Sequence, residues 1–193
     1  MDKEVLDRGS LMFEEATRSA IEEAEHRLGM SFPKSVKDFW MASGGWIQLR
    51  LDADDGKIYG PAEIDRIATL YPDLINADAL PDSSDEDYFT YSESQDSIDV
   101  RESYIETAFA MSEMVDAGLY VLNPSVKTED GEWEAWFLGW ELPGALRFKS
   151  FAHLMQYAYL NSMHKEEREH MYYSGSEIKG TCADAGLTDL TLD

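Results

Sequence analysis

The sequence predicts an α+β fold, because a hairpin, a further strand and a helix follow one another in the chain. Residues 119–122 and 133–140 are rich in apolar and aromatic side chains, as half-buried strands are. An Asp-Gly turn signal within residues 128–131 joins them as an antiparallel hairpin. A third short strand begins at Leu146, and Ser150 caps a helix whose apolar residues recur at helical spacing. Such a unit is the nucleus of an α+β layer.

The two faces of the second hairpin strand differ in character, because side chains alternate along a strand. One face carries Trp133, Ala135 and Phe137, and we expect it to face the core. The other face combines two carboxylates with large apolar groups, from Glu132, Glu134, Trp136 and Leu138. Either a helix or loop covers Trp136, as is usual for a large aromatic side chain, or this face contacts a partner.

The N-terminal half of the chain predicts three helices and a small hairpin. Apolar residues at helical spacing, glycines at helix ends and prolines at helix starts delimit these elements. The expected elements are a helix over residues 10–28 capped by Gly29, a helix from Pro33 to Gly44-Gly45, a hairpin of residues 46–51 and 57–59, and a helix from Pro61 to about Leu70.

Residues 76–102 differ in composition from the rest of the chain. Aspartates, glutamates and serines dominate the segment, which predicts a variable acidic loop insert with a short helix or strand near residues 88–91. Residues 103–115 have a helical apolar stripe. We expect one α+β domain over residues 1–163, followed by a charged helical tail and a weakly patterned C-terminus over residues 164–193.

The net charge limits the classes of partner. The 193 residues contain 39 Asp and Glu against 16 Lys and Arg, a formal net charge of −23. Such a chain repels nucleic acid and anionic membrane surfaces, whereas it attracts a basic protein and associates with it faster at low salt. Solubility alone is the other interpretation of an acidic surface. We therefore expect no nucleic-acid or membrane partner.

The cellular compartment is indicated by cysteine usage and by the absence of targeting signals. Cys182 is the single cysteine, which excludes an intrachain disulfide and suits a reducing environment. The N-terminus lacks an apolar signal core, and no run of eighteen apolar residues occurs. These features predict a cytoplasmic protein.

Motifs for metal or catalytic chemistry are weak. Asp52, Asp54 and Asp55 superficially suggest a calcium loop, but the glycine follows at the wrong position, and a turn between strands explains them. Glu167 and His170 have the Glu-x-x-His spacing of di-iron bundles, without the second copy that such sites need. No nucleophile elbow or phosphate-binding glycine loop is present. We expect no metal, no cofactor and no catalysis.

Two sets of motifs resemble a known family. The first set runs from a glutamate-rich helix ending at Leu28-Gly29, through Phe32-Pro33 and Phe39-Trp40, to Gly44-Gly45. The second set comprises Leu122-Asn123-Pro124, the stretch Asp-Gly-Glu-Trp-Glu-Ala-Trp over residues 130–136, Pro143-Gly144-Ala145 and Ser150-Phe151. In this order and spacing they resemble the SUKH superfamily. That group includes the fungal Smi/Knr cell-wall assembly regulators and many bacterial immunity proteins.

The resemblance implies an α+β domain with a mixed, mostly antiparallel sheet and helices packed against it. It also implies a bacterial cytosolic protein that neutralises a toxin, often a nuclease or deaminase, by binding it tightly. The family has no common catalytic residues and no common binding site that could be transferred to this chain.

Three functions are compatible with these observations. The first is an immunity protein that binds a basic toxin domain through the acidic segment and the hairpin edge, with Asp82, Asp85, Glu86, Asp87, Glu132, Glu134 and Trp136 as the expected contact residues. The second is a regulatory or scaffold protein of the Smi/Knr type without a toxin. The third is an enzyme that uses Glu132 and Glu134 as paired carboxylates. Self-association stays open, because Met171, Tyr172 and Tyr173 give the tail apolar side chains.

Overall fold

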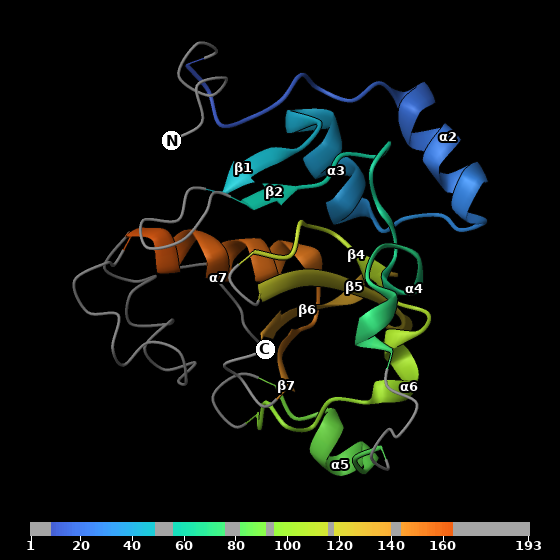
Figure 1. Ribbon diagram of the computed structural model, residues 1–193, viewed down its shortest axis with the longest axis vertical. Helices are drawn as coiled ribbons and strands as arrows, with labels where there is room; N and C mark the ends of the chain where they lie inside the picture. Colours follow the sequence, from blue (N-terminus) through green and yellow to red (C-terminus); the bar gives the residue numbers. More distant parts are fainter. Residues whose placement is uncertain are drawn as a thin grey trace.

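The computed structural model describes residues 9–48, 56–75, 82–91, 95–115, 118–139 and 144–163 (Figure 1). The expected charged tail over residues 164–193 lies outside this part, as do Cys182, the Glu167–His170 pair and the acidic turn at residues 52–55. The described helices are α2 (Arg18–Leu28), α3 (Lys34–Ser43), α4 (Ile67–Leu70), the 3-10 helix η1 (Pro72–Leu74), α5 (Asp85–Tyr88), α6 (Glu102–Ile105) and α7 (Phe151–Met163). The strands are β1 (Trp46–Gln48), β2 (Gly56–Ile58), β3 (Asp65–Arg66), β4 (Phe109–Ala110), β5 (Gly118–Lys127), β6 (Trp133–Gly139) and β7 (Gly144–Phe148).

The strands form two sheets, and each described strand pair is antiparallel. β1 and β2 make a two-stranded sheet, while the main sheet has the order β3-β4-β5-β6-β7. The predicted hairpin is its centre, because β5 and β6 pair from Gly118↔Gly139 to Lys127↔Trp133 with an irregularity after Asn123. Gly131 occupies the turn with a positive φ of 86°, as the Asp-Gly signal predicts. The α+β prediction is confirmed.

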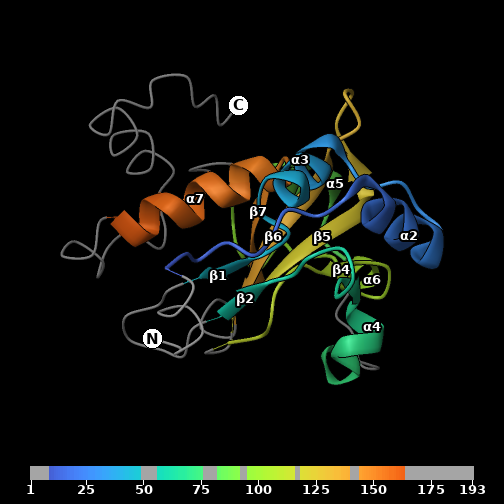
Figure 2. The ribbon, with the colours of Figure 1, turned by 90° about the horizontal axis from the view of Figure 1, so that it is seen from above.

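One face of the sheet packs against the longer helices. α7 lies on β6 and β7 and contacts α3, which in turn contacts α2 (Figure 2). Trp40, Trp133 and Phe151 are almost completely buried in this core, and Phe32 contacts both indole rings edge-on or tilted. The Oγ of Ser150 accepts from the backbone N–H of His153 at 3.3 Å, which confirms the predicted cap of α7.

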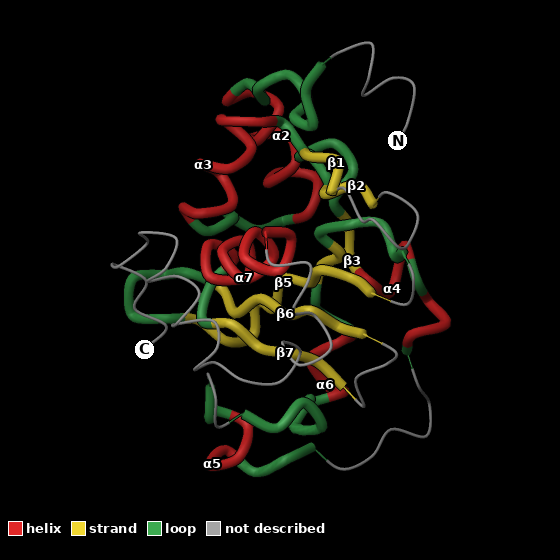
Figure 3. Tube along the Cα trace, turned by 90° about the vertical axis from the view of Figure 1, so that its left-hand side faces the viewer, coloured by secondary structure: helices red, strands yellow, loops and turns green. Residues whose placement is uncertain are grey.

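The opposite face of the sheet is also covered. Short elements before β4, namely α4, η1 and α6, pack there with the segment around α5 (Figure 3). The apolar residues of this second core are Ile67, Ile105, Ala108, Ala110, Leu119, Val121, Trp136 and Ala145. The central strands are therefore buried on both sides. Trp136 is covered in this structure, which agrees with the first of the two interpretations of the mixed face.

Two predicted helices have different structures. Residues 61–70 contain a turn, strand β3 and the four-residue α4, since Asp65 and Arg66 pair with β4. Residues 103–115 contain the end of α6 and then β4, which hydrogen-bonds between β3 and β5. The first helix is shorter than expected, because Thr17 caps it: its Oγ1 accepts from the N–H of Ala20 at 3.1 Å. The other elements agree with their predictions within a few residues, including α3 with its cap at Gly44 and the β1–β2 pair.

Candidate functional site

The four predicted acidic residues of the insert lie together on α5 and just before it. Asp82, Asp85, Glu86 and Asp87 are all exposed. Ser84 caps the short helix: its Oγ accepts from the N–H of Asp87 at 3.2 Å and donates to the Asp87 carboxylate at 2.7 Å. Carboxylates in a first helical turn are stabilised by the free N–H groups there, so negative charge fits this position.

Arg101 connects the acidic helix to α6. Its guanidinium donates to the Asp85 carboxylate, to the carbonyl of Ser83 at 3.1 Å and to the hydroxyl of Tyr104 at 3.0 Å. The same group lies 4.6 Å from the ring of Tyr88 and 5.5 Å from that of Phe89, which is 44% exposed. The exposed ring of Phe89 therefore lies beside the acidic residues and contacts the guanidinium of Arg101.

A buried carboxylate lies beneath this surface. Glu134 of β6 is 1% exposed and accepts four hydrogen bonds. The donors are Tyr88 Oη at 2.6 Å, Tyr91 Oη at 2.7 Å, Asn123 Nδ2 at 2.8 Å and Trp136 Nε1 at 2.7 Å. Asn123 faces Glu134 across the β5–β6 pair, and Trp136 follows two residues along the same face. Multiple donors are what a buried carboxylate needs to offset its lost hydration.

Arg147 is the second buried charge under the insert. It lies on β7 opposite Trp136 and is 1% exposed. Its guanidinium donates to the backbone carbonyls of Asp99, of Thr90 at 3.3 Å and of Asp96 at 3.3 Å. It also lies 4.8 Å from the ring of Tyr88, whose hydroxyl binds Glu134. Glu134 and Arg147 of the sheet therefore bind both described parts of the insert, residues 82–91 and 95–101.

The seven predicted contact residues therefore divide into three groups. The four acids on and before α5 are exposed and adjacent. Glu134 and Trp136 are buried, so neither side chain is accessible to a partner in this structure. Glu132 binds the start of α3, where it accepts from the backbone N–H of Ser35 at 2.9 Å and from the Ser35 hydroxyl. The hairpin edge is thus separate from the acidic surface.

The comparison with protein families assigns the chain. The family model for SMI1 / KNR4 (SUKH-1) matches residues 15–157, well over half of the 193 residues. The chain belongs to the SMI1 / KNR4 family (SUKH-1). The resemblance to the SUKH superfamily is thereby confirmed. No curated protein and no solved structure matches this SUKH-1 chain.

SUKH-1 membership and the site geometry both bear on the third compatible function, an enzyme that uses Glu132 and Glu134 as paired carboxylates. The family consists generally of non-catalytic immunity and regulatory proteins. In this SUKH-1 chain Glu132 and Glu134 have separate partners, Ser35 for the first and the tyrosine pair for the second, so they do not converge on one reacting atom. Within the described ranges no group of three or more His, Cys, Asp or Glu side chains is placed to hold a metal. No helix of the described part is long and apolar enough to cross a bilayer.

The buried network of this SUKH-1 domain predicts sensitivity to alkaline pH. Burial raises the pKa of the Tyr88 and Tyr91 hydroxyls, and the Glu134 carboxylate raises both further. In the unfolded chain tyrosine ionises near pH 10, whereas the folded protein keeps these protons to higher pH. The stability that the two protonated tyrosine hydroxyls contribute is therefore fully present below about pH 10. It is lost as the pH rises from there towards the folded-state pKa values of Tyr88 and Tyr91. In that range we expect the free energy of unfolding to fall by about 1.4 kcal/mol per pH unit for Tyr88, and by less for Tyr91, which is only partly buried.

Urea unfolding at a series of alkaline pH values, with tyrosinate absorbance as a second signal, measures this dependence. The double variant Tyr88→Phe/Tyr91→Phe is the control, because it lacks both hydroxyls. Its free energy of unfolding should fall less steeply with pH than that of the wild-type chain. Equal slopes for the two proteins would contradict the prediction.

Proposed function

We propose that this SUKH-1 chain is an immunity protein of the bacterial cytosol that binds and neutralises a basic, nuclease-type toxin and catalyses no reaction. The observation that carries the proposal is the exposed acidic surface of Asp82, Asp85, Glu86 and Asp87, which buried side chains of the central sheet hold in place. The chain also has a net charge of −23. The family to which it belongs includes immunity proteins.

The chemistry of a nuclease explains why an acidic surface would inhibit it. A protein that cleaves nucleic acid binds phosphates with Lys and Arg side chains. Carboxylates spaced along α5 offer the same basic groove an alternative set of negative charges. Long-range attraction then accelerates the encounter, and the exposed ring of Phe89, at the C-terminal end of α5, adds apolar contact area next to the charged residues.

Anchoring of the acidic segment supports this function energetically. A segment that becomes ordered only on binding loses conformational freedom at that moment, which lowers its affinity. Here Arg101 holds the start of the insert through Ser83 and Asp85, and Arg147 holds its later part through backbone carbonyls. The acidic surface is thus in position before the partner arrives.

The test neutralises the acidic surface with amide side chains of the same size, whose carbonyl oxygens can still accept hydrogen bonds from Arg101 and Ser84. We expect Asp85→Asn/Glu86→Gln/Asp87→Asn to slow association with the basic protein that co-purifies with the chain by about tenfold at low salt. The difference should shrink as salt screens the charges. Stopped-flow or surface-based kinetics at several salt concentrations measure the association rate constant.

A matched control removes three charges elsewhere. Glu14, Glu15 and Glu22 are exposed before and on α2, which lies at the opposite end of the molecule from α5 (Figure 1). The variant Glu14→Gln/Glu15→Gln/Glu22→Gln should retain most of the association rate. Equal slowing by both triple variants would mean that only the net charge matters. A co-purifying partner that is not basic would instead favour the regulatory alternative of the Smi/Knr type.

A further inference from the structure

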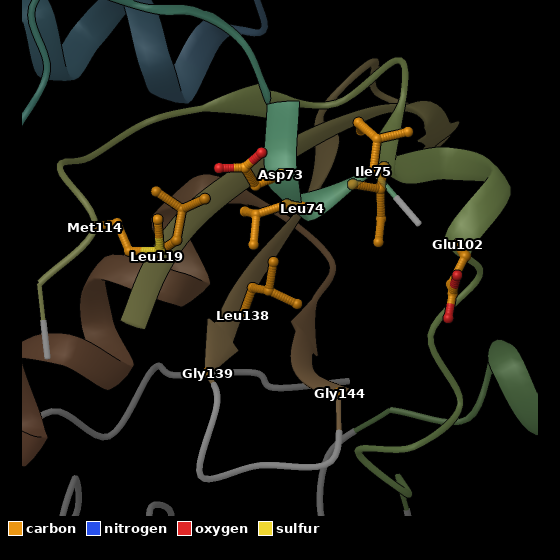
Figure 4. Close-up of a pocket in the computed structure, with 10 residues that line it drawn as sticks. Asp73, Leu74, Ile75, Glu102, Met114, Leu119, Leu138, Gly139 and Gly144 are labelled. Carbon is orange, nitrogen blue, oxygen red and sulfur yellow. The ribbon is translucent and has the colours of Figure 1, made fainter. Parts of the chain in front are cut away.

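A pocket opens on the same sheet face as the buried network. It has a volume of about 440 Å³, and its apolar lining includes Leu74, Ile75, Leu119 and Leu138. In Figure 4 Leu74 and Leu138 lie at its centre, with Leu119 beside them. Pockets that bind small groups are typically of this size and of this apolar character. The pocket therefore has room for a large apolar side chain, and its lining offers apolar contacts.

The lining of the pocket carries negative charge. Asp73 and Glu102 both line it, and Figure 4 shows Asp73 next to Leu74 and Glu102 farther away, beyond Ile75. Among the described residues that line the pocket, none is basic. An apolar group that enters is therefore favoured when it carries positive charges next to it, and is disfavoured when it carries negative ones.

The pocket and the acidic surface of α5 both border helix α6. Glu102 begins α6 directly after Arg101, whose guanidinium binds Asp85. The hydroxyl of Ser103 also donates to Asp82 at 2.6 Å, so α6 borders both features. Along β6, Leu138 in the pocket and Glu134 under the insert are four residues apart on one face, about 13 Å at the usual rise of a strand.

We propose that this pocket receives a large apolar side chain of the partner protein that is flanked by lysine or arginine in the partner's sequence. The inference rests on the proposed function, because it names the part of a basic partner that the chain recognises. The acidic surface raises the rate of encounter with any basic protein, whereas an apolar side chain in a concave pocket supplies the affinity that distinguishes one partner from another.

The first experiment uses peptides of defined charge and the full chain with labelled leucine methyl groups. The blocked tetrapeptide Lys-Leu-Phe-Lys should shift the methyl resonances of Leu74, Leu119 and Leu138 in NMR spectra, and Asp-Leu-Phe-Asp should not. The variant Asp73→Asn/Glu102→Gln should weaken binding of the basic peptide about fivefold at low salt. As the control, Glu106→Gln/Glu129→Gln removes two exposed charges that do not line the pocket and should leave binding unchanged.

Several results would overturn the inference. They are the absence of methyl shifts with the basic peptide, equal binding of both peptides, or equal weakening in the two double variants. Hexylammonium ion is a further probe: if it binds as tightly as the basic peptide, the pocket recognises a small cation and not a peptide segment.

The second experiment separates the pocket from the proposed function. Leu74→Trp places a larger side chain in the pocket, and we expect it to increase the dissociation rate of the natural partner at least tenfold. Circular dichroism and thermal unfolding check that the variant is folded. If the partner dissociates from Leu74→Trp as slowly as from the wild-type chain, the pocket assignment fails while the proposed function stands. If no basic partner exists, the proposed function fails, and the peptide titration still decides what the pocket binds.

Discussion

The substitution Glu134→Ala should reduce the free energy of unfolding by about 3–5 kcal/mol. The carboxylate is buried and accepts from two tyrosine hydroxyls, one asparagine amide and one indole N–H. Truncation removes the acceptor from three buried donors and from the partly buried hydroxyl of Tyr91, and an unsatisfied buried polar group is more costly than an absent one. It also removes the negative charge that binds the hydroxyl of Tyr88, whose ring lies 4.8 Å from the Arg147 guanidinium.

Chemical denaturation measures the loss, and Glu132→Ala is the matched control two residues earlier. Glu132 caps the start of α3 by binding Ser35, so its removal should cost about 1 kcal/mol. In Glu134→Ala, the pKa values of Tyr88 and Tyr91 should also fall, because burial remains but the neighbouring negative charge is gone. Similar losses for Glu132→Ala and Glu134→Ala would contradict the role of the buried network.

The sequence predicts the central hairpin and its covering helix because their signals are local. Asp130 and Gly131 determine the turn, and Ser150 determines the start of α7 within three residues of its own position. Gly29 and Gly44 end α2 and α3 in the left-handed conformation for the same reason. Each of these features depends on neighbours in the chain, so no knowledge of the tertiary structure is needed.

The two wrong helix predictions have the opposite cause. Strands β3 and β4 contain two residues each, which is too short for a period-two pattern to show. Their conformation is determined by pairing with each other and by the pairing of β4 with β5. The apolar run from Ala108 to Met111 is buried throughout, and such a run does not distinguish a buried strand from a buried helix.

The candidate site has some features that local sequence determines and others that depend on the tertiary structure. Exposure of the acids on α5 follows from composition, because a short helix of consecutive carboxylates cannot be buried. Burial of Glu134 depends on Tyr88 and Tyr91, which are 46 and 43 residues away in the chain. The available signal was the clustering of tyrosines within an otherwise polar insert, since an aromatic ring there predicts a contact with the core. Without the tertiary structure, that signal does not identify Glu134 as the partner of these tyrosines.

The substitution Arg147→Met should release the acidic insert from the sheet. Methionine keeps an unbranched side chain of similar length but donates no hydrogen bond, so the carbonyls of Thr90, Asp96 and Asp99 lose their common partner. We expect the free energy of unfolding to fall by about 2–4 kcal/mol. Hydrogen exchange of the amides in residues 82–101 should accelerate more than exchange in β5 and β6, because the lost contacts tie this segment and not the core strands.

The control for charge is Lys149→Met, two residues further along the chain. Lys149 lies 5.9 Å from the ring of Tyr91 but is not completely buried. This variant removes one positive charge and leaves the hydrogen bonds of Arg147 to the insert in place. In this variant the amides of the insert should exchange at nearly the wild-type rate. If the acidic surface acts because it is held in place, Arg147→Met should also weaken partner binding, since ordering of the insert then opposes association. Faster exchange in residues 82–101 with unchanged affinity would show that the partner does not need a preformed acidic surface.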